Sequence, residues 1–341
     1  MGHAGYVTPP SSHSTEPSGD NVDTSDVALP PLDRTLPPWP GGHEEASGVR
    51  LHVRRTEPEL SPDNADTAVY VHGLGGSSTN WTDLGVLLAP WSAGIAVDLP
   101  GFGFSEPAPD FDFTLAAHTE QLAKYIAGLG TGPVHLLGNS MGGAIAALLA
   151  GTRPDLVKTL TLISPAVPDL RPLPSRLSDP RMALAYLPVV GRSARRQLAA
   201  MTPNERARQV IKLCFADPSS FPESRLAELA KEHGERLSLP WAMTAMSRST
   251  SDIFRVWLAR GPSSIWSALR AVTAPSLVVW GDKDRVISAR KARRTARTLR
   301  DGRLLMLSNV GHVAQMEHPT AAAEAVLALW QTANADDGYR R

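Results

Sequence analysis

The sequence has little cysteine and no excess of charge of either sign. Cys214 is the only cysteine among 341 residues, so an intrachain disulfide cannot form, which is typical of a reducing compartment. Lys and Arg together number 34, as do Asp and Glu, and this balance argues against a nucleic-acid partner, which selects basic surfaces. CxxC pairs and HExxH are also missing, so we expect neither a zinc site nor another cofactor.

Long apolar runs are missing as well. No stretch of about 18 apolar residues occurs, so an integral membrane segment is not expected. The N-terminal residues lack the basic start and the apolar stretch of a secretory signal. We therefore expect a cytoplasmic protein.

From Val49 onward the chain alternates between strand and helix patterns. Short apolar runs bounded by turn residues predict strands at 49–55, 67–73, 92–101, 133–140, 158–165, 274–284 and 302–312. Apolar residues at helical spacing predict helices at 113–130, 141–156, 288–300 and 320–333. This alternation predicts an α/β fold with a mostly parallel central sheet flanked by helices.

Two segments depart from this alternation. Residues 1–42 are rich in Pro, Ser, Gly and Asp, which predicts a flexible arm, with Trp39 as the residue that docks on the body. Residues 166–264 show helical and irregular patterns without a convincing strand, which predicts a helical cap inserted between two late strands. Residues 43–165 and 265–341 would then form the core.

The sharpest motif is Gly138-Asn139-Ser140-Met141-Gly142, between a predicted strand and a helix of small residues. A serine on such a sharp turn crowds its neighbours, and glycines at both flanks have no Cβ to clash. The following helix directs free N–H groups toward developing negative charge. The motif predicts Ser140 as a nucleophile, and the alternative is a tight structural turn.

A serine nucleophile needs a base, and the base needs a carboxylate to hold its tautomer. His312 follows the last predicted strand, at the sheet edge where open α/β sheets bind ligands, whereas we interpret His318 as structural or surface. Asp284 is favoured as the carboxylate because it lies further into its loop than Asp282, and Asp169 is a third candidate. His118, on a predicted helix, is expected to be solvated.

Acyl transfer also needs N–H donors for the oxyanion. The N–H of Met141, just after the nucleophile, is the first predicted donor. The second is expected from the loop His72-Gly73-Leu74-Gly75-Gly76, where Leu74 is favoured over Gly73 and Gly75. His72 would then shape this loop and take no catalytic part.

Five motifs in this order resemble the α/β-hydrolase superfamily over about residues 49–334: HGLGG (72–76), DLPGFGFS (98–105), GNSMGG (138–143), WGDKDRVI (280–287) and GHVAQMEHP (311–319). The chain order Ser140, Asp284, His312 matches the family's triad order. The resemblance implies the α/β-hydrolase fold with its cap at 166–264. It also implies that Asp98 and the turn 100–103 shape the wall of the site.

The expected function is hydrolysis of a carboxylic ester of a medium-sized apolar substrate. Gly73 is expected to contact that substrate, together with some of the apolar cap side chains, which are Leu187, Leu198, Trp241, Met243, Met246, Trp257 and Trp266. The alternative is that these cap side chains only hold the helices of the cap together. Trp241 and Trp266 are favoured among them.

Two other functions stay open. One is carbon–carbon bond hydrolysis, as in the similar meta-cleavage-product hydrolases, whose usual Ser-Gly-Pro-Gly oxyanion loop differs from HGLGG. The other is a ligand-binding receptor built on a hydrolase scaffold. Six cap arginines also leave peripheral contact with lipid headgroups open.

Overall fold

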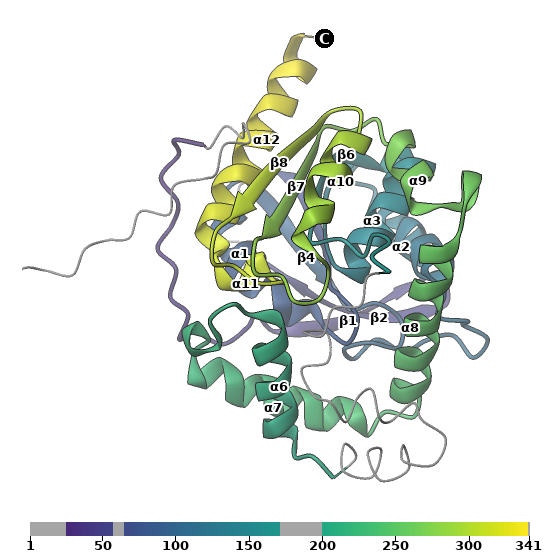
Figure 1. The fold of residues 1–341 in the computed structure, drawn as a ribbon, viewed down its shortest axis with the longest axis vertical. Coiled ribbons are helices and arrows are strands. Elements are labelled where there is room, and N and C mark those ends of the chain that lie inside the picture. The colour runs from purple at the N-terminus through teal and green to yellow at the C-terminus, as the bar shows by residue number, and fades with distance from the viewer. Residues whose placement is uncertain (1–24, 57–64, 171–199, 340–341) are drawn as a thin grey trace, which may run out of the picture.

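A mixed eight-stranded sheet forms the centre of the computed structural model, which describes residues 25–56, 65–170 and 200–339, with side chains up to residue 335 (Figure 1). The strand order is β1-β2-β4-β3-β5-β6-β7-β8. Strands β1 (Gly41–Ala46) and β2 (Val49–Arg55) pair antiparallel, and β2 also pairs antiparallel with β4. All further neighbours pair parallel, which confirms the mostly parallel sheet.

The parallel strands coincide with the predicted apolar runs. Nearly every residue of β3, β5, β6 and β7 is buried, as expected for strands that are covered by helices on both faces. The bounds of the parallel strands are β3 Asp66–Val71, β4 Ser92–Val97, β5 Val134–Asn139, β6 Val157–Ile163, β7 Ser276–Gly281 and β8 Gly302–Leu307.

Helices cover both faces of the sheet. One apolar core forms beneath α2 (Leu115–Leu129), α3 (Met141–Thr152), α9 (Ile265–Ala271) and α10 (Ala292–Thr298). A second core forms on the opposite face beneath α1 (Thr82–Leu88), α11 (Ala314–Glu317) and α12 (Pro319–Tyr339). Short 3-10 turns complete the described elements: η2 Ser78–Trp81, η3 Pro154–Leu156, η5 Pro218–Ser220, η6 Gly261–Ser263 and η7 Ala289–Lys291.

The expectation for His118 is wrong. This side chain on α2 is fully buried, with the rings of Phe102 and Phe111 beside it at centroid distances of 5.8 and 5.0 Å. Burial lowers the pKa of His118 to about 3. Its burial follows from the cap, because His118 Nε2 lies 3.4 Å from Ser249 Oγ on the cap helix that covers this side of α2.

A helical insertion separates β6 from β7, as predicted. Its described helices are α6 (Pro203–Cys214), α7 (Glu223–Leu237) and α8 (Ala242–Leu258). Hydrogen bonds tie α8 to the core near its middle and near its C-terminal end: Ser249 Oγ donates to Phe113 O at 2.9 Å, and Trp257 Nε1 donates to Ala166 O at 2.9 Å. The insertion therefore sits on the core through buried polar contacts as well as apolar packing.

The predicted arm falls in two parts. Residues 1–24 lie outside the described residues, whereas residues 25–42 contact the body. Trp39 is 7% exposed and its ring lies against Gly85 of α1, which confirms its docking. Leu29 and Leu32 pack against the core beneath α12, and Gly41 already begins β1. None of the described helices combines the length and the apolar character that crossing a membrane requires.

Candidate active site

Ser140 lies at the junction of β5 and α3 in a strained backbone conformation. Its φ is 54° and its ψ is −116°, a region that costs a non-glycine residue about 1–3 kcal/mol and that clusters at functional sites. The neighbouring strand holds the turn, because Ser140 N donates to Ile163 O at 3.0 Å and Ser140 O accepts from Ala166 N at 2.8 Å. The turn thus projects the residue from the carboxyl edge of the sheet.

The glycines around Ser140 are required by close packing. A Cβ at Gly138 would collide with the backbone of Gly142, and a Cβ at Gly142 would collide with the carbonyl of Val71. A Cβ at Gly143 would lie 2.9 Å from Pro165 Cβ. The turn can therefore approach β3 and the loop that follows β6 only because these positions lack side chains.

His312 and Asp284 form a buried pair. His312 Nδ1 lies 2.9 Å from Asp284 Oδ2, and the two side chains are 5% and 0% exposed. The other carboxylate oxygen accepts hydrogen bonds from Val286 N and Ile287 N at 2.8 and 2.9 Å. A carboxylate acceptor at Nδ1 places the proton there and leaves Nε2 as the acceptor that a general base needs.

The competing residues have other partners. Asp282 Oδ1 accepts from Asn309 N at 2.7 Å, and its side chain is 39% exposed. Asp169 Oδ2 accepts from Ser288 N at 2.9 Å, and its other oxygen lies 3.8 Å from Lys291 Nζ. His318 lies at the junction of α11 and α12.

The Ser140 turn and the His312 loop are joined by Asn139. Its Nδ2 donates to His312 O and to Ile163 O, both at 3.1 Å. The residue before the predicted nucleophile therefore holds the backbone of the predicted base. The sequence assigned no role to Asn139, because the bond joins segments that are 173 residues apart.

The loop after β3 also lies against Ser140. A Cβ at Gly73 would lie 3.1 Å from Ser140 Cβ, and the loop turns back through Gly76 N, which donates to Gly73 O at 3.0 Å. Gly75 has φ of +71°, which favours glycine. Leu74 lies inside this turn. Met141 is the first residue of α3, so its N–H has no acceptor within the helix.

His72 holds this loop in shape. Its side chain is fully buried, Nδ1 donates to Gly73 O at 2.7 Å, and Nε2 accepts from Leu99 N at 3.0 Å. Burial lowers the pKa of His72, so the neutral ring with its proton on Nδ1 prevails at neutral pH. This arrangement supports the loop-shaping role that the sequence indicated.

Glu317 anchors the His312 loop to the cap, which the sequence did not indicate. Its side chain is buried, and Oε2 accepts from Gly311 N at 2.6 Å and from Ala216 N at 3.2 Å, while Oε1 accepts from Asp217 N at 3.0 Å. His312 N in turn donates to Cys214 O at 2.6 Å. The carboxylate thus links the loop of the predicted base to the segment after α6.

Trp241 and Trp266, the two favoured substrate contacts, belong to different helices, α8 and α9. Trp241 caps the start of α8 and packs against the core beneath the cap. Trp266, on α9, lies under the guanidinium of Arg294 at 3.9 Å from its ring centroid. Helix α9 contacts α3 at Gly151, eleven residues and about 16 Å along the helix from Ser140. The residue of α9 that makes this contact is Ala268, two residues after Trp266.

Other cap side chains can also be located. Met246 on α8 lies over the loop after β3, where its methyl group would be 2.8 Å from a Cβ at Gly75. Met243 is 70% exposed, and Trp257 is buried between cap and core. Leu187 and Leu198 lie outside the described residues.

Asp98, directly after β4, is a buried carboxylate that joins three segments of the chain. Its oxygens accept from His52 Nδ1 at 2.8 Å, from Phe104 N at 3.0 Å and from Ser78 N at 2.5 Å. Burial alone would raise the pKa of Asp98, but the hydrogen bond and the attraction from His52 outweigh it and lower this pKa to about 2.

Asp98 is therefore expected to make stability depend on acidity. Because the folded pKa lies below the unfolded value of about 4, the ionised group stabilises the fold above pH 4, by about 2–3 kcal/mol, and this contribution is lost as the pH falls toward 2. The free energy of unfolding of D98N should lie below that of the wild type by this amount at pH 7, and the gap should narrow between pH 4 and 2 in urea titrations. The exposed variant D110N is the control. A gap that is constant with pH would contradict the assignment.

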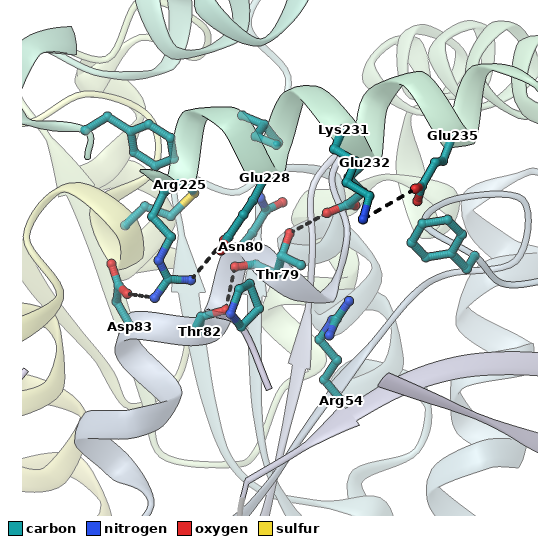
Figure 2. A pocket seen from close by; sticks show the side chains of 15 residues that line it. Arg54, Thr79, Asn80, Thr82, Asp83, Arg225, Glu228, Lys231, Glu232 and Glu235 are labelled. Atoms are coloured by element: carbon teal, nitrogen blue, oxygen red, sulfur yellow. Dashed lines mark hydrogen bonds and ion pairs between the residues drawn. The ribbon is translucent and has the colours of Figure 1, made fainter. Parts of the chain in front are cut away.

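A cavity of about 280 Å³ lies between α7 and the segment η2–α1 (Figure 2). Polar and charged side chains from both elements meet across it: Arg225 Nη2 lies 3.2 Å from Asp83 Oδ1, and Thr79 Oγ1 donates to Glu232 Oε2 at 3.1 Å (Figure 2). None of the predicted catalytic residues lines this cavity. Among the described residues, no group of three or more His, Cys, Asp and Glu side chains has an arrangement that could hold a metal ion.

Comparison with known proteins finds a family model that matches most of the chain. A family model described as "alpha/beta hydrolase fold" matches residues 68–319. A monoacylglycerol lipase of Xenopus laevis, abhd6-B, is 24% identical over 288 residues, which are 82% of this chain and 80% of that protein. The dihydrolipoyllysine-residue acetyltransferase component of an acetoin cleaving system from Pseudomonas putida is 30% identical over 274 residues, 80% of this chain and 65% of that protein.

The solved structures agree on the fold. A membrane phospholipase A, described as a bacterial virulence factor, superimposes with a TM-score of 0.69 at 22% identity, over 86% of each chain. Further matches include lipases and meta-cleavage-product hydrolases. These relatives cleave different bonds, so they support a hydrolase without selecting its substrate.

Proposed function

Because the chain belongs to the α/β-hydrolase fold family, we propose that it is a serine hydrolase that cleaves carboxylic esters of medium-sized apolar substrates. The observation that carries the proposal is the buried His312–Asp284 pair, joined through Asn139 to the strained turn of Ser140. An imidazole oriented by a carboxylate is the base that activates a serine hydroxyl group, and Asn139 links the backbone of this base to the turn of Ser140.

The proposed mechanism proceeds through an acyl-enzyme. His312 Nε2 takes the proton of Ser140 as its Oγ attacks the ester carbonyl carbon, and the carbonyl oxygen becomes an oxyanion. The N–H groups of Met141 and Leu74 hold this oxyanion. His312 then protonates the leaving alcohol as the carbon–oxygen bond breaks. The same histidine next activates a water molecule, which releases the acid and restores Ser140. Asp284 keeps the proton on Nδ1 throughout.

A panel of p-nitrophenyl esters graded by acyl length tests the proposal. We expect multiple turnovers by the wild type and labelling by a fluorophosphonate. Labelling without turnover would favour a receptor on a hydrolase scaffold. Faster turnover of a vinylogous diketone acid than of any ester would favour carbon–carbon bond hydrolysis. Several relatives are lipases, which favours esters. The cytoplasmic location remains a prediction.

Met246 is expected to limit the length of the acyl group. Its methyl group lies over Gly75, beside the proposed oxyanion loop, so a larger side chain would take up space there. We expect M246W to lower kcat/KM for long acyl esters relative to short ones by about tenfold, and M246A to shift the ratio the other way, because a methylene in an apolar pocket changes discrimination by about 1–3 kcal/mol. M243A, on the same helix but 70% exposed, should leave the ratio unchanged. An unchanged ratio in M246W and M246A would place the acyl group elsewhere.

A further inference from the structure

Arg236, near the end of α7, contacts the loop that follows β3 directly. Its Nη2 donates to Gly75 O at 2.7 Å and to Gly76 O at 2.9 Å. Its side chain is only 12% exposed. One planar guanidinium therefore bridges two consecutive carbonyl groups of the loop, and it restrains the orientation of both peptide planes.

Glu232, one turn earlier on α7, completes the contact. Arg236 Nη1 lies 2.9 Å from Glu232 Oε1. Figure 2 shows the other contact of this carboxylate, in which Glu232 Oε2 accepts from Thr79 Oγ1 at 3.1 Å. Thr79 Oγ1 in turn lies 2.8 Å from Ser77 Oγ. Arg236 and Glu232 thus contact the loop at two places, Gly75–Gly76 and Ser77–Thr79. Because both side chains are nearly buried, their opposite charges form an ion pair that neither residue could leave without an unpaired buried charge.

The loop that Arg236 and Glu232 contact also carries Leu74, whose N–H is the proposed oxyanion donor. Gly73, which lies against Ser140, accepts the hydrogen bond from Gly76 N that closes the turn around Leu74. A rotation of the Gly75–Gly76 peptide would therefore move the Leu74 N–H relative to the reacting carbonyl. A misplacement of about 1 Å at a catalytic group can lower a rate about 100-fold.

We infer that Arg236 is a positioning residue of the ester hydrolase, which sets the oxyanion loop from the cap through the Gly75 and Gly76 carbonyl groups. The inference rests on the proposed function. Arg236 touches the carbonyl side of the loop, and its charge is paired with Glu232, so its effect passes through the loop geometry. Helix α7 thereby fixes the position of a proposed catalytic loop in addition to packing on the core.

The decisive variant is R236Q, assayed on the best ester found for the wild type. We expect kcat to fall about 10- to 100-fold while KM stays within about threefold, because loss of one well-placed oxyanion donor costs about 10²–10³ and displacement costs less. The rate of fluorophosphonate labelling should fall in parallel. R225Q is the matched control: Arg225 lies on the same helix, is 10% exposed and pairs with Asp83, but it makes no bond to the oxyanion loop.

Two further variants separate positioning from folding. R236K retains a charge for Glu232 but not the planar fork, so it should recover folding and only part of kcat. The double variant E232Q/R236Q leaves no unpaired charge, so its melting temperature should equal that of the wild type. Its kcat should nevertheless be as low as that of R236Q. The inference would be overturned if R236Q or the double variant kept the wild-type kcat, or if R225Q lost as much kcat as R236Q. Either result would leave the proposed function intact. A wild-type protein that turns over no ester would overturn the proposed function and the inference with it.

Discussion

Replacement of Ser140 by alanine is expected to lower kcat for a p-nitrophenyl ester by a factor on the order of 10⁴ or more, as removal of a triad serine does in other hydrolases. The physical reason is that alanine cannot form the acyl-enzyme, so only direct attack by water remains. Alanine retains the Cβ, so the strained backbone at φ 54° is kept and the fold should be unaffected. The measurement is steady-state kinetics beside fluorophosphonate labelling, which the variant should lose.

Ser164 offers a matched control for this experiment. It lies just after the adjacent strand β6, is fully buried and also has a positive φ, of 43°. S164A therefore removes a hydroxyl group from a similar place one strand away. We expect its kcat within a few-fold of the wild type. If S140A retained turnover, or if S164A lost as much, Ser140 would not be the nucleophile.

Replacement of Asp284 by asparagine is expected to lower kcat by about 10³- to 10⁴-fold. Asparagine preserves the shape of the side chain, but its amide group can offer an N–H to His312 Nδ1. The ring would then carry its proton on Nε2, where it could no longer accept the proton of Ser140. We expect KM to change little, because Asp284 is buried and would not touch the substrate.

Asp282 and Asp169 are the controls for that variant, since the sequence left both open as alternatives. D282N removes one oxygen that accepts from Asn309 N, and D169N alters the contact with Ser288 N. Both variants should keep kcat within about tenfold of the wild type. A larger loss in either of them than in D284N would transfer the orienting role to that residue.

The turns that depend on backbone geometry could be predicted from the sequence. The requirement for glycine at 138 and 142 follows from the crowding of the Ser140 turn: a Cβ at Gly138 would collide with the backbone of Gly142, and a Cβ at Gly142 with the carbonyl group of Val71. The buried strands were also recognisable, because a continuous apolar run is what a sheet covered on both faces needs. Strand β1 was missed because GGHEEA contains residues that are depleted in strands, and its pairing with β2 decides the outcome.

The polar contacts between distant segments could not be predicted in this way. Arg236 and Gly75 are 161 residues apart, and Glu317 meets Asp217 across 100 residues. Arginine and glutamate on a cap helix or at a helix junction are usually solvated, so nothing local marks these two. The contact of Trp266 with Arg294 likewise could not be predicted from the sequence, and its role as a substrate contact stays a prediction.

The contacts of Glu317 and Arg236 have a consequence for protein engineering. The cap reaches the His312 loop through Ala216 and Asp217, and it reaches the loop after β3 through Arg236. A chimera that receives the α6–α7 segment of a relative would lose these anchors unless the donor supplies equivalent groups. Transplants meant to change substrate preference should therefore carry both junctions along, or their turnover will decline for reasons unrelated to the new pocket.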